Sequence, residues 1–128
     1  MAKKEKIEYL KNFISKQQIN SLEYLLKSEE SAYAKEKIDY FFDLIQKMPK
    51  SYETDGQGDK AIAYLHYFKS GIDFYITEKD MEDEQLQAFG LVNMNGELEL
   101  GYISIKEILE LNFELDLNFV PKKLKEIN

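Results

Sequence analysis

The segment from Thr77 to Glu84 has the densest set of groups that could do chemistry. Five of its eight residues are carboxylates, at Glu78, Asp80, Glu82, Asp83 and Glu84. Such a run can be a solvated loop, a surface that presents negative charge to a basic partner, or paired carboxylates that hold Mg²⁺ or transfer protons. A second polar segment, with Tyr52, Glu53 and Asp55, is a candidate part of the same surface.

Two further features have a chemical and a structural interpretation. The loop Asp55 to Asp59 begins like a calcium loop, but Lys60 stands where a glycine is needed and His66 where a bidentate glutamate is needed, so a turn is favoured. His66 is the only histidine, and it lies in an apolar segment between Leu65 and Tyr67. A hydrogen-bonded strand histidine is favoured there over a metal ligand or a general base. No serine lies in a G-x-S-x-G motif.

The tyrosines of the region predicted to form the sheet could stack on nucleobases, as in single-strand binders that use a sheet. Such surfaces also need cations, and between Ala61 and Ile103 the chain has only Lys69 and Lys79. We therefore interpret most of these tyrosines as core and rim residues, with one or two free to anchor a partner. The five tyrosines considered are Tyr52, Tyr64, Tyr67, Tyr75 and Tyr102.

Composition limits the function classes further. The 128 residues have a formal net charge of −7, and all 17 positive residues are lysine. Arginine supplies the planar fork that reads guanine and phosphate, so its lack, together with the acidic balance, argues against direct DNA binding. There is no cysteine, which excludes disulfides and thiolate sites. The N-terminus does not match a signal peptide and no stretch is long enough to span a membrane, so we expect a cytoplasmic protein.

The first 48 residues predict helices. Apolar residues recur at helical spacing from Ile7 to Ile14, and Ser15 with Gln18 forms a capping box before a second helix that reaches Leu26. Ser28 is expected to cap a third helix that ends before Pro49.

From Ser51 onwards the pattern predicts a sheet. Strands over 61–68 and 72–77 are joined at Lys69-Ser70-Gly71, and strands over 87–94 and 97–103 at Asn95-Gly96, which suits a type I′ turn. Ser104 with Glu107 predicts a helix over 105–111, and the alternation of 115–119 predicts an edge strand. We therefore expect one α+β domain over 1–128, with N-terminal helices over 1–48 packed on a mainly antiparallel sheet of four or five strands over 49–128, and one further helix after the second hairpin.

The region from Met48 to Leu124 resembles a small bacterial family known as domain of unknown function 2958. The resemblance rests on Pro49 with Tyr-Glu-Thr-Asp at 52–55, Tyr-Phe at 67–68, Phe-Tyr-Ile-Thr-Glu at 74–78 with Asp80, Phe-Gly-Leu-Val at 89–92, Glu-Leu-Gly-Tyr at 99–102 and Asp-Leu at 116–117. Family members commonly have a tryptophan-rich stretch at the position of residues 71–75, whereas this chain has no tryptophan. The resemblance implies a gene of plasmids, conjugative elements or phages, near DNA-transfer or anti-restriction functions, and it implies no catalytic residues.

These observations lead to one main hypothesis and two alternatives. We expect a non-enzymatic acidic protein of mobile-element or phage type that binds a protein partner with a basic surface, as a counter-defence inhibitor or DNA mimic. One alternative is a Mg²⁺-dependent enzyme that uses Glu53, Asp55, Glu78 and Asp80, and the other is a single-stranded nucleic-acid binder. No cofactor and no membrane contact are predicted. The predicted partner-binding residues are Tyr52, Glu53, Asp55, Glu78, Asp80, Glu82, Asp83 and Glu84.

Overall fold

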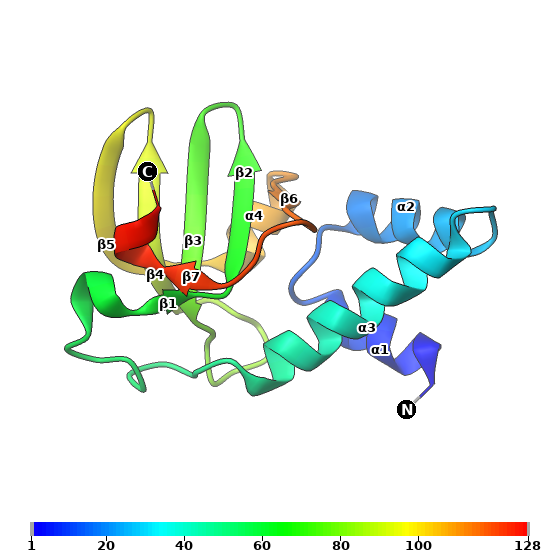
Figure 1. The fold of residues 1–128 in the computed structure, drawn as a ribbon, viewed down its shortest axis with the longest axis horizontal. Helices are drawn as coiled ribbons and strands as arrows, with labels where there is room; N and C mark the ends of the chain where they lie inside the picture. Colours follow the sequence, from blue (N-terminus) through cyan, green and yellow to red (C-terminus); the bar gives the residue numbers. More distant parts are fainter. Residues whose placement is uncertain (1, 128) are drawn as a thin grey trace.

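The computed structural model describes residues 2–127 and has the predicted α+β architecture, with helices before a mainly antiparallel sheet (Figure 1). The α-helices are α1 (Lys3–Leu10), α2 (Lys16–Leu26), α3 (Ser31–Lys47) and α4 (Ile105–Glu110). The strands are β1 (Ile62–Ala63), β2 (Leu65–Lys69), β3 (Ile72–Glu78), β4 (Ala88–Met94), β5 (Glu97–Ile103), β6 (Glu114–Leu115) and β7 (Lys122–Lys123). Two short 3₁₀ turns, η1 (Gly58–Lys60) and η2 (Leu124–Glu126), complete the set.

Two sheets are present in the described chain. Five strands are ordered β5-β4-β3-β2-β6, and β1 pairs with β7 in a separate two-stranded ribbon. The hairpin turns fall where the sequence predicts them, because Ser70 and Gly71, and then Asn95 and Gly96, have the positive φ angles that a type I′ turn requires. In Figure 1 the ribbon of β1 and β7 crosses in front of the lower part of the larger sheet, and α4 lies behind it.

Two predicted strands are shorter than expected. The segment 61–68 divides at Tyr64 into β1 and β2, and these two strands join different sheets. The predicted edge strand over 115–119 pairs only at β6, because Asp116 ends it with a turn. A side-chain oxygen of Asp116 accepts from the Asn118 N–H, and the Phe119 N–H donates to the Asp116 carbonyl. Alternation alone could not reveal that turn.

The helix caps are partly as predicted. The Ser15 hydroxyl accepts from the Gln18 N–H and the Ser104 hydroxyl from the Glu107 N–H, each completing half of a capping box. The Gln18 side chain does not return to Ser15 but bonds both the N–H and the carbonyl of Leu115 in β6. The prediction that Ser28 caps α3 is wrong, since Ser28 closes the preceding turn by accepting from the Glu30 N–H.

Each face of the larger sheet has its own apolar cluster. The larger cluster combines residues of α1 to α4 with one face of the sheet, including Tyr67, whose hydroxyl donates to the Phe13 carbonyl. The smaller lies on the other face, beneath β1, β7 and η2, and contains Tyr75, Leu91 and Phe119. Ile72, Phe74 and Ile76 contribute to the first cluster and Tyr75 to the second, so the faces of β3 are divided as its alternation predicts. No described helix is both long and apolar enough to cross a membrane.

Candidate functional site

Glu78, at the end of β3, is a buried carboxylate that anchors a loop. Its side chain is almost inaccessible, with the residue 4% exposed. One oxygen accepts from the Tyr52 N–H at 2.8 Å, and the other accepts from the Thr54 N–H at 2.8 Å and from the Thr54 hydroxyl. Glu78 is therefore not part of the exposed acidic surface in which the sequence places it. Its charge fixes the 52–54 backbone instead.

A β-bulge explains why Glu78 points where it does. Ile76 pairs with Gly90, but Glu78 pairs with Phe89, so the register of β3 and β4 shifts by one residue between them. Regular alternation would place Glu78 on the same face as Ile76, towards the helices. The bulge turns it to the opposite face, beside Phe89 and the loop that it binds.

Tyr52 is held by these bonds in a conformation that bulky residues avoid. Its φ is +73°, in the left-handed region, which costs about 1–2 kcal/mol for a residue with a β-carbon. Its ring is exposed, and its hydroxyl lies 3.2 Å from the Tyr102 hydroxyl of β5. The pKa of Tyr102 is raised by this hydrogen bond, then by partial desolvation and by nearby negative charge that includes Glu78 and Asp55. The loop is thus fastened to β3 at one point and to β5 at another.

A cavity of about 330 Å³ lies between this loop and the open face of the sheet. Tyr52, Glu78 and Tyr102 contribute polar groups to its wall, and Phe89 and Leu100 contribute apolar surface. It combines apolar surface with a few fixed polar groups, as ligand-binding cavities do. The remaining lining residues are Thr54, Asp55, Gly56, Gly58, Ala61, Thr77 and Leu124.

The acidic loop after β3 folds around a buried glutamine. The Gln85 side chain accepts from the Asp80 N–H at 2.8 Å and donates to the Glu82 carbonyl at 2.9 Å. The two Asp80 oxygens accept from the Glu82 and Gln87 N–H groups. These bonds hold the loop backbone in place, while the side chains of Glu82, Asp83 and Glu84 are exposed.

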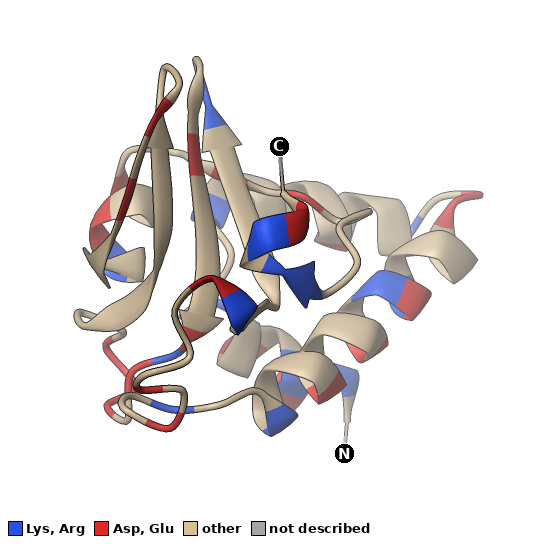
Figure 2. Cartoon of the chain, turned by 60° about the vertical axis from the view of Figure 1, so that its left-hand side comes forward, with Lys and Arg blue, Asp and Glu red and all other residues tan. Residues whose placement is uncertain are grey.

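The two polar segments of the sequence analysis lie side by side. Ser51 donates to the carbonyls of Lys79 and Gln87, and Lys50 pairs with Lys79 in a short parallel bridge. We call their exposed carboxylates the acidic end, and Figure 2 shows Asp and Glu positions gathered in these loops at the lower end of the sheet. The acidic end consists of Glu53, Asp55, Glu82, Asp83 and Glu84.

A buried lysine lies beneath the acidic end. The Lys79 ammonium donates to the Ile45 carbonyl in the last turn of α3 at 2.5 Å, where the helix dipole favours a cation. Burial lowers the pKa of Lys79, the positive charge of Lys50 adds to that effect, and Glu53 and Asp83 oppose it. Because Glu53 and Asp83 both act on Lys79, the two loops of the acidic end share one electrostatic environment.

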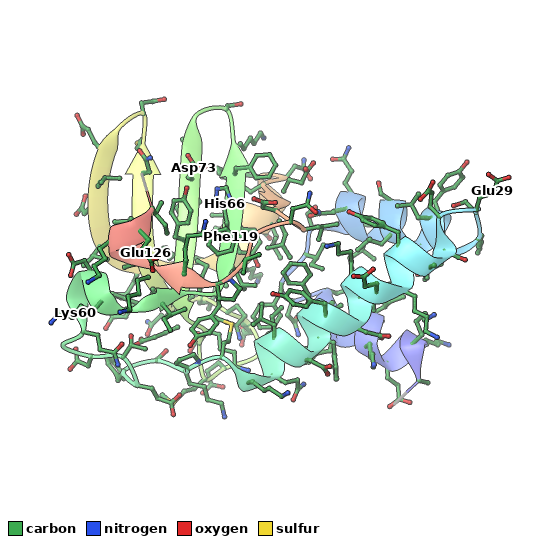
Figure 3. All side chains as sticks on the ribbon, viewed as in Figure 1. Glu29, Lys60, His66, Asp73, Phe119 and Glu126 are labelled. Atoms are coloured by element: carbon green, nitrogen blue, oxygen red, sulfur yellow. The ribbon has the colours of Figure 1, made fainter. Side chains whose placement is uncertain are left out.

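His66 has the structural role that the sequence favours. Its Nε2 lies 2.7 Å from an Asp73 oxygen and its Nδ1 lies 3.1 Å from an Asp116 oxygen. The ring also stacks on Tyr75 at 4.5 Å between centroids. Figure 3 labels His66 with its neighbours Asp73 and Phe119. Asp73 could have been found from the sequence, because the Ser70-Gly71 turn places it diagonally across from His66. Asp116 could not, since its position depends on the turn that ends β6.

The tyrosines do not form a continuous stacking surface. Tyr67 is fully buried and Tyr75 nearly so, whereas Tyr52 and Tyr102 are exposed. Tyr64 packs against the larger apolar cluster. The interpretation that most of the five tyrosines are packing residues is therefore confirmed, and the expectation that an exposed one anchors a partner stays a prediction.

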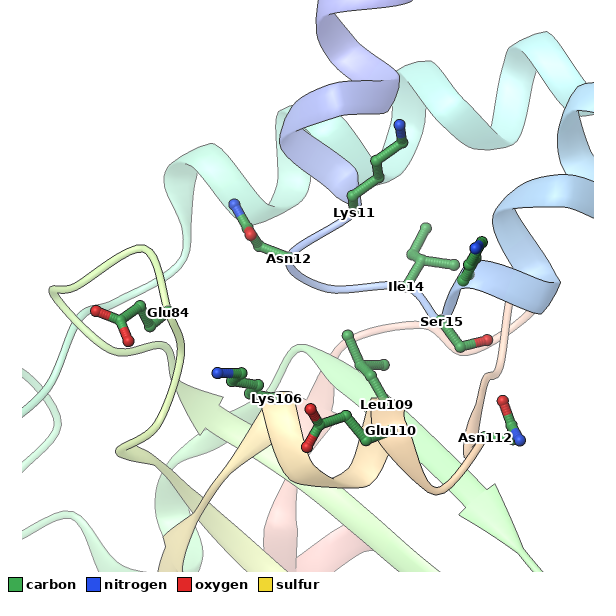
Figure 4. Close-up of a pocket in the computed structure, with 10 residues that line it drawn as sticks. Lys11, Asn12, Ile14, Ser15, Glu84, Lys106, Leu109, Glu110 and Asn112 are labelled. Carbon is green, nitrogen blue, oxygen red and sulfur yellow. The ribbon is translucent and has the colours of Figure 1, made fainter.

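A second cavity, of about 470 Å³, lies between the α1–α2 connection and α4 (Figure 4). Ile14 and Leu109 form its apolar part, and Lys106 and Glu110 are at its rim. Among the predicted site residues only Glu84 reaches it. It therefore belongs to the packing of the helical part against α4 rather than to the acidic end.

Comparison with known proteins identifies no relative of this chain. No protein-family profile, no curated protein and no solved structure matches the chain. The resemblance to domain of unknown function 2958 therefore stays a prediction from the sequence.

Proposed function

We propose that the protein is a protein-binding module whose acidic end contacts a basic surface of its partner. The observation that carries this proposal is that the five exposed carboxylates are on backbone held in place by buried side chains. Glu78 fixes the 52–54 segment and Gln85 fixes the 80–85 loop. A charge run that only keeps a loop solvated does not need such anchors, whereas a binding surface gains affinity when its loops are already ordered.

Exposed apolar residues among the carboxylates support a protein partner. Tyr52 and Met81 each expose more than 60% of their surface, and Leu86 is also exposed. Protein interfaces combine such anchors with a charged rim that steers association. A partner that offers lysine or arginine around a small apolar depression would match this arrangement.

The geometry favours the two alternatives less. Three of the four carboxylates of the Mg²⁺ hypothesis are already engaged with backbone N–H groups, because Glu53 accepts from the Lys50 N–H, Glu78 holds 52–54 and Asp80 holds its own loop. Over residues 2–127 no three His, Cys, Asp or Glu side chains are placed to share a metal. A nucleic-acid surface would need the tyrosine stack, of which only Tyr52 and Tyr102 are exposed.

The family resemblance extends the proposal to a counter-defence protein of a mobile element. In that setting the acidic end would occupy a basic nucleic-acid groove of the partner, because fixed carboxylates imitate phosphate charge. This extension depends on the resemblance and on the net charge of −7.

The test is affinity capture from lysate of its native cells with three immobilised proteins. The first is the wild type, and the second carries Glu82→Gln, Asp83→Asn and Glu84→Gln. The control carries Glu23→Gln, Glu29→Gln and Glu30→Gln, which are exposed residues of α2 and of the α2–α3 turn. Figure 3 shows Glu29 at the end of the molecule away from the sheet. Both variants lose the same charge, so only position differs.

We expect the wild type and the control to recover the same proteins, and the acidic-end variant to lose them. Equal recovery by all three, or no recovery above background by any, would count against the proposal.

A further inference from the structure

The strand β5 is an open edge of the larger sheet. It is seven residues long and pairs with β4 on one side, and no segment of residues 2–127 pairs with its other side. Figure 1 shows it as the outermost strand on the left. An unpaired strand of this length presents a row of backbone donors and acceptors to solvent.

The opposite edge of the sheet, at β6, is protected, unlike the edge at β5. β6 has only two residues, and Gln18 bonds both the N–H and the carbonyl of Leu115. Proteins also protect edges with charged side chains, above all lysine, with proline or with a bulge. β5 has no lysine, proline or bulge, and its charged residues are Glu97 and Glu99, which repel an acidic strand but attract a basic one. One edge is therefore blocked and the other is left available.

The turn at Asn95-Gly96 fixes which backbone groups of β5 are free. In a hairpin with a two-residue turn, Met94 and Glu97 form the first hydrogen-bonded pair, and every second pair after it is hydrogen-bonded. The residues between those pairs direct their N–H and carbonyl groups away from β4. These residues are Leu98, Leu100 and Tyr102.

The side chains of β5 specify the chemistry of a strand that would pair there. Leu98, Leu100 and Tyr102 lie on one face and are exposed, and the last two line the cavity beside Glu78. Glu97 and Glu99 lie on the other face, also exposed. The space above Gly101, next to Glu99, is open and can accept a long side chain. An added strand would therefore match β5 if apolar and basic residues alternated along it.

We propose that an extended segment of the partner, with alternating apolar and basic residues, adds to the sheet along β5. This inference rests on the proposed function and names the form in which that partner binds. The lysine or arginine side chains pair with Glu97 and Glu99, and the apolar ones cover Leu98, Leu100 and Tyr102. Main-chain hydrogen bonds give the affinity and the alternation gives the register, as in other cases of strand addition. A second copy of this chain fits less well, because two chains of net charge −7 repel each other.

The experiment uses a capped peptide that alternates lysine and valine over the length of β5, added to the full chain labelled with ¹⁵N. Two further peptides serve as controls, one with the same composition in two blocks and one with glutamate in place of lysine. Amide hydrogen exchange then reports whether the outward N–H groups of Leu98, Leu100 and Tyr102 become protected.

Two variants of Leu100 separate the backbone contribution from the side-chain contribution. Leu100→Pro removes an outward N–H but no bond to β4, which edge strands tolerate. Leu100→Thr removes a similar amount of apolar surface and keeps the N–H. We expect the proline variant to bind the alternating peptide about tenfold more weakly than the threonine variant, the equivalent of one lost hydrogen bond. The double variant Glu97→Lys and Glu99→Lys gives a test that does not depend on the folding of the proline variant, and it should prefer the glutamate peptide.

Protection of the three outward amides by the alternating peptide, but not by the block peptide, supports the inference. Equal binding of both lysine peptides, or binding that leaves these amides unprotected, overturns it. Protection of the same amides without peptide, with a rise in mass on concentration, would also overturn it, since the occupant would then be a second copy. A negative peptide result together with lysate capture that depends on the acidic end would refute strand addition and leave the proposed function intact.

Discussion

The substitution Glu78→Gln tests whether a buried carboxylate fixes the Tyr52 loop. Glu78 accepts two N–H bonds and one hydroxyl bond, and hydrogen bonds to a charged group contribute about 1.5–3 kcal/mol each. Glutamine keeps one oxygen, which can still accept from the Thr54 N–H and hydroxyl, but its amide NH₂ then faces the Tyr52 N–H. One charge-assisted bond is lost and two donors oppose each other. We expect a loss of about 2–3 kcal/mol in the free energy of unfolding.

The assay is urea unfolding of the wild type, Glu78→Gln and Glu82→Gln. The last variant makes the same chemical change on an exposed carboxylate, and it should stay within about 0.5 kcal/mol of the wild type. The Tyr52 ring should also lose its fixed position near Tyr102, which the ring proton shifts of both tyrosines would report. If Glu78→Gln were as stable as Glu82→Gln, the anchoring role of Glu78 would be wrong.

Two further predictions concern contacts that tie the helices to the sheet. Tyr67→Phe leaves the buried Phe13 carbonyl without its partner, and we expect a cost of about 1–3 kcal/mol in denaturant unfolding at neutral pH. Burial also raises the pKa of Tyr67 above its ordinary value near 10, so the contribution of Tyr67 to stability is complete below about pH 10 and is lost above it, where the unfolded chain ionises. The phenylalanine variant should therefore lose stability less steeply above about pH 10 than the wild type. An identical dependence of stability on alkaline pH would refute this. Gln18→Ala removes both hydrogen bonds to Leu115, so we expect it to lower the free energy of unfolding by about 1–3 kcal/mol and to speed hydrogen exchange of the Leu115 amide. Unchanged exchange would show that Gln18 does not protect the β6 edge of the sheet.

The features that the sequence predicts well are those set by local chemistry. Asn95-Gly96 and Ser70-Gly71 determine their turns through positive φ angles, and Ser15 and Ser104 begin helices because their hydroxyls satisfy a free N–H. These effects act over a few residues, so no tertiary information is needed.

The features that the sequence misses depend on distant partners. Glu78 looks like the other carboxylates of its run, and only the bulge in β3 and the arrival of the 52–54 loop show that it is buried. Gln18 looks like half of a capping box but bonds a strand almost a hundred positions away. The contact between Tyr52 and Tyr102 likewise arises from tertiary packing.

The sequence indicated two polar segments, and the structure shows that their residues have different roles. The segments 52–55 and 77–84 do lie together at one end of the sheet. Within them, Glu78 and Asp80 hold the loops, and the five carboxylates of the acidic end are left exposed. The sequence shows where carboxylates are concentrated, but it does not distinguish the carboxylates that hold a loop by hydrogen bonds from those that face solvent.

The most direct test of the central claim is amide hydrogen exchange of the protein alone and in the complex captured from its native cells. We expect partner binding to slow exchange in 51–56 and 80–87, the two segments that carry the acidic end. Protection confined to α1, α2 and α3, with the acidic end exchanging as in the free protein, would contradict it.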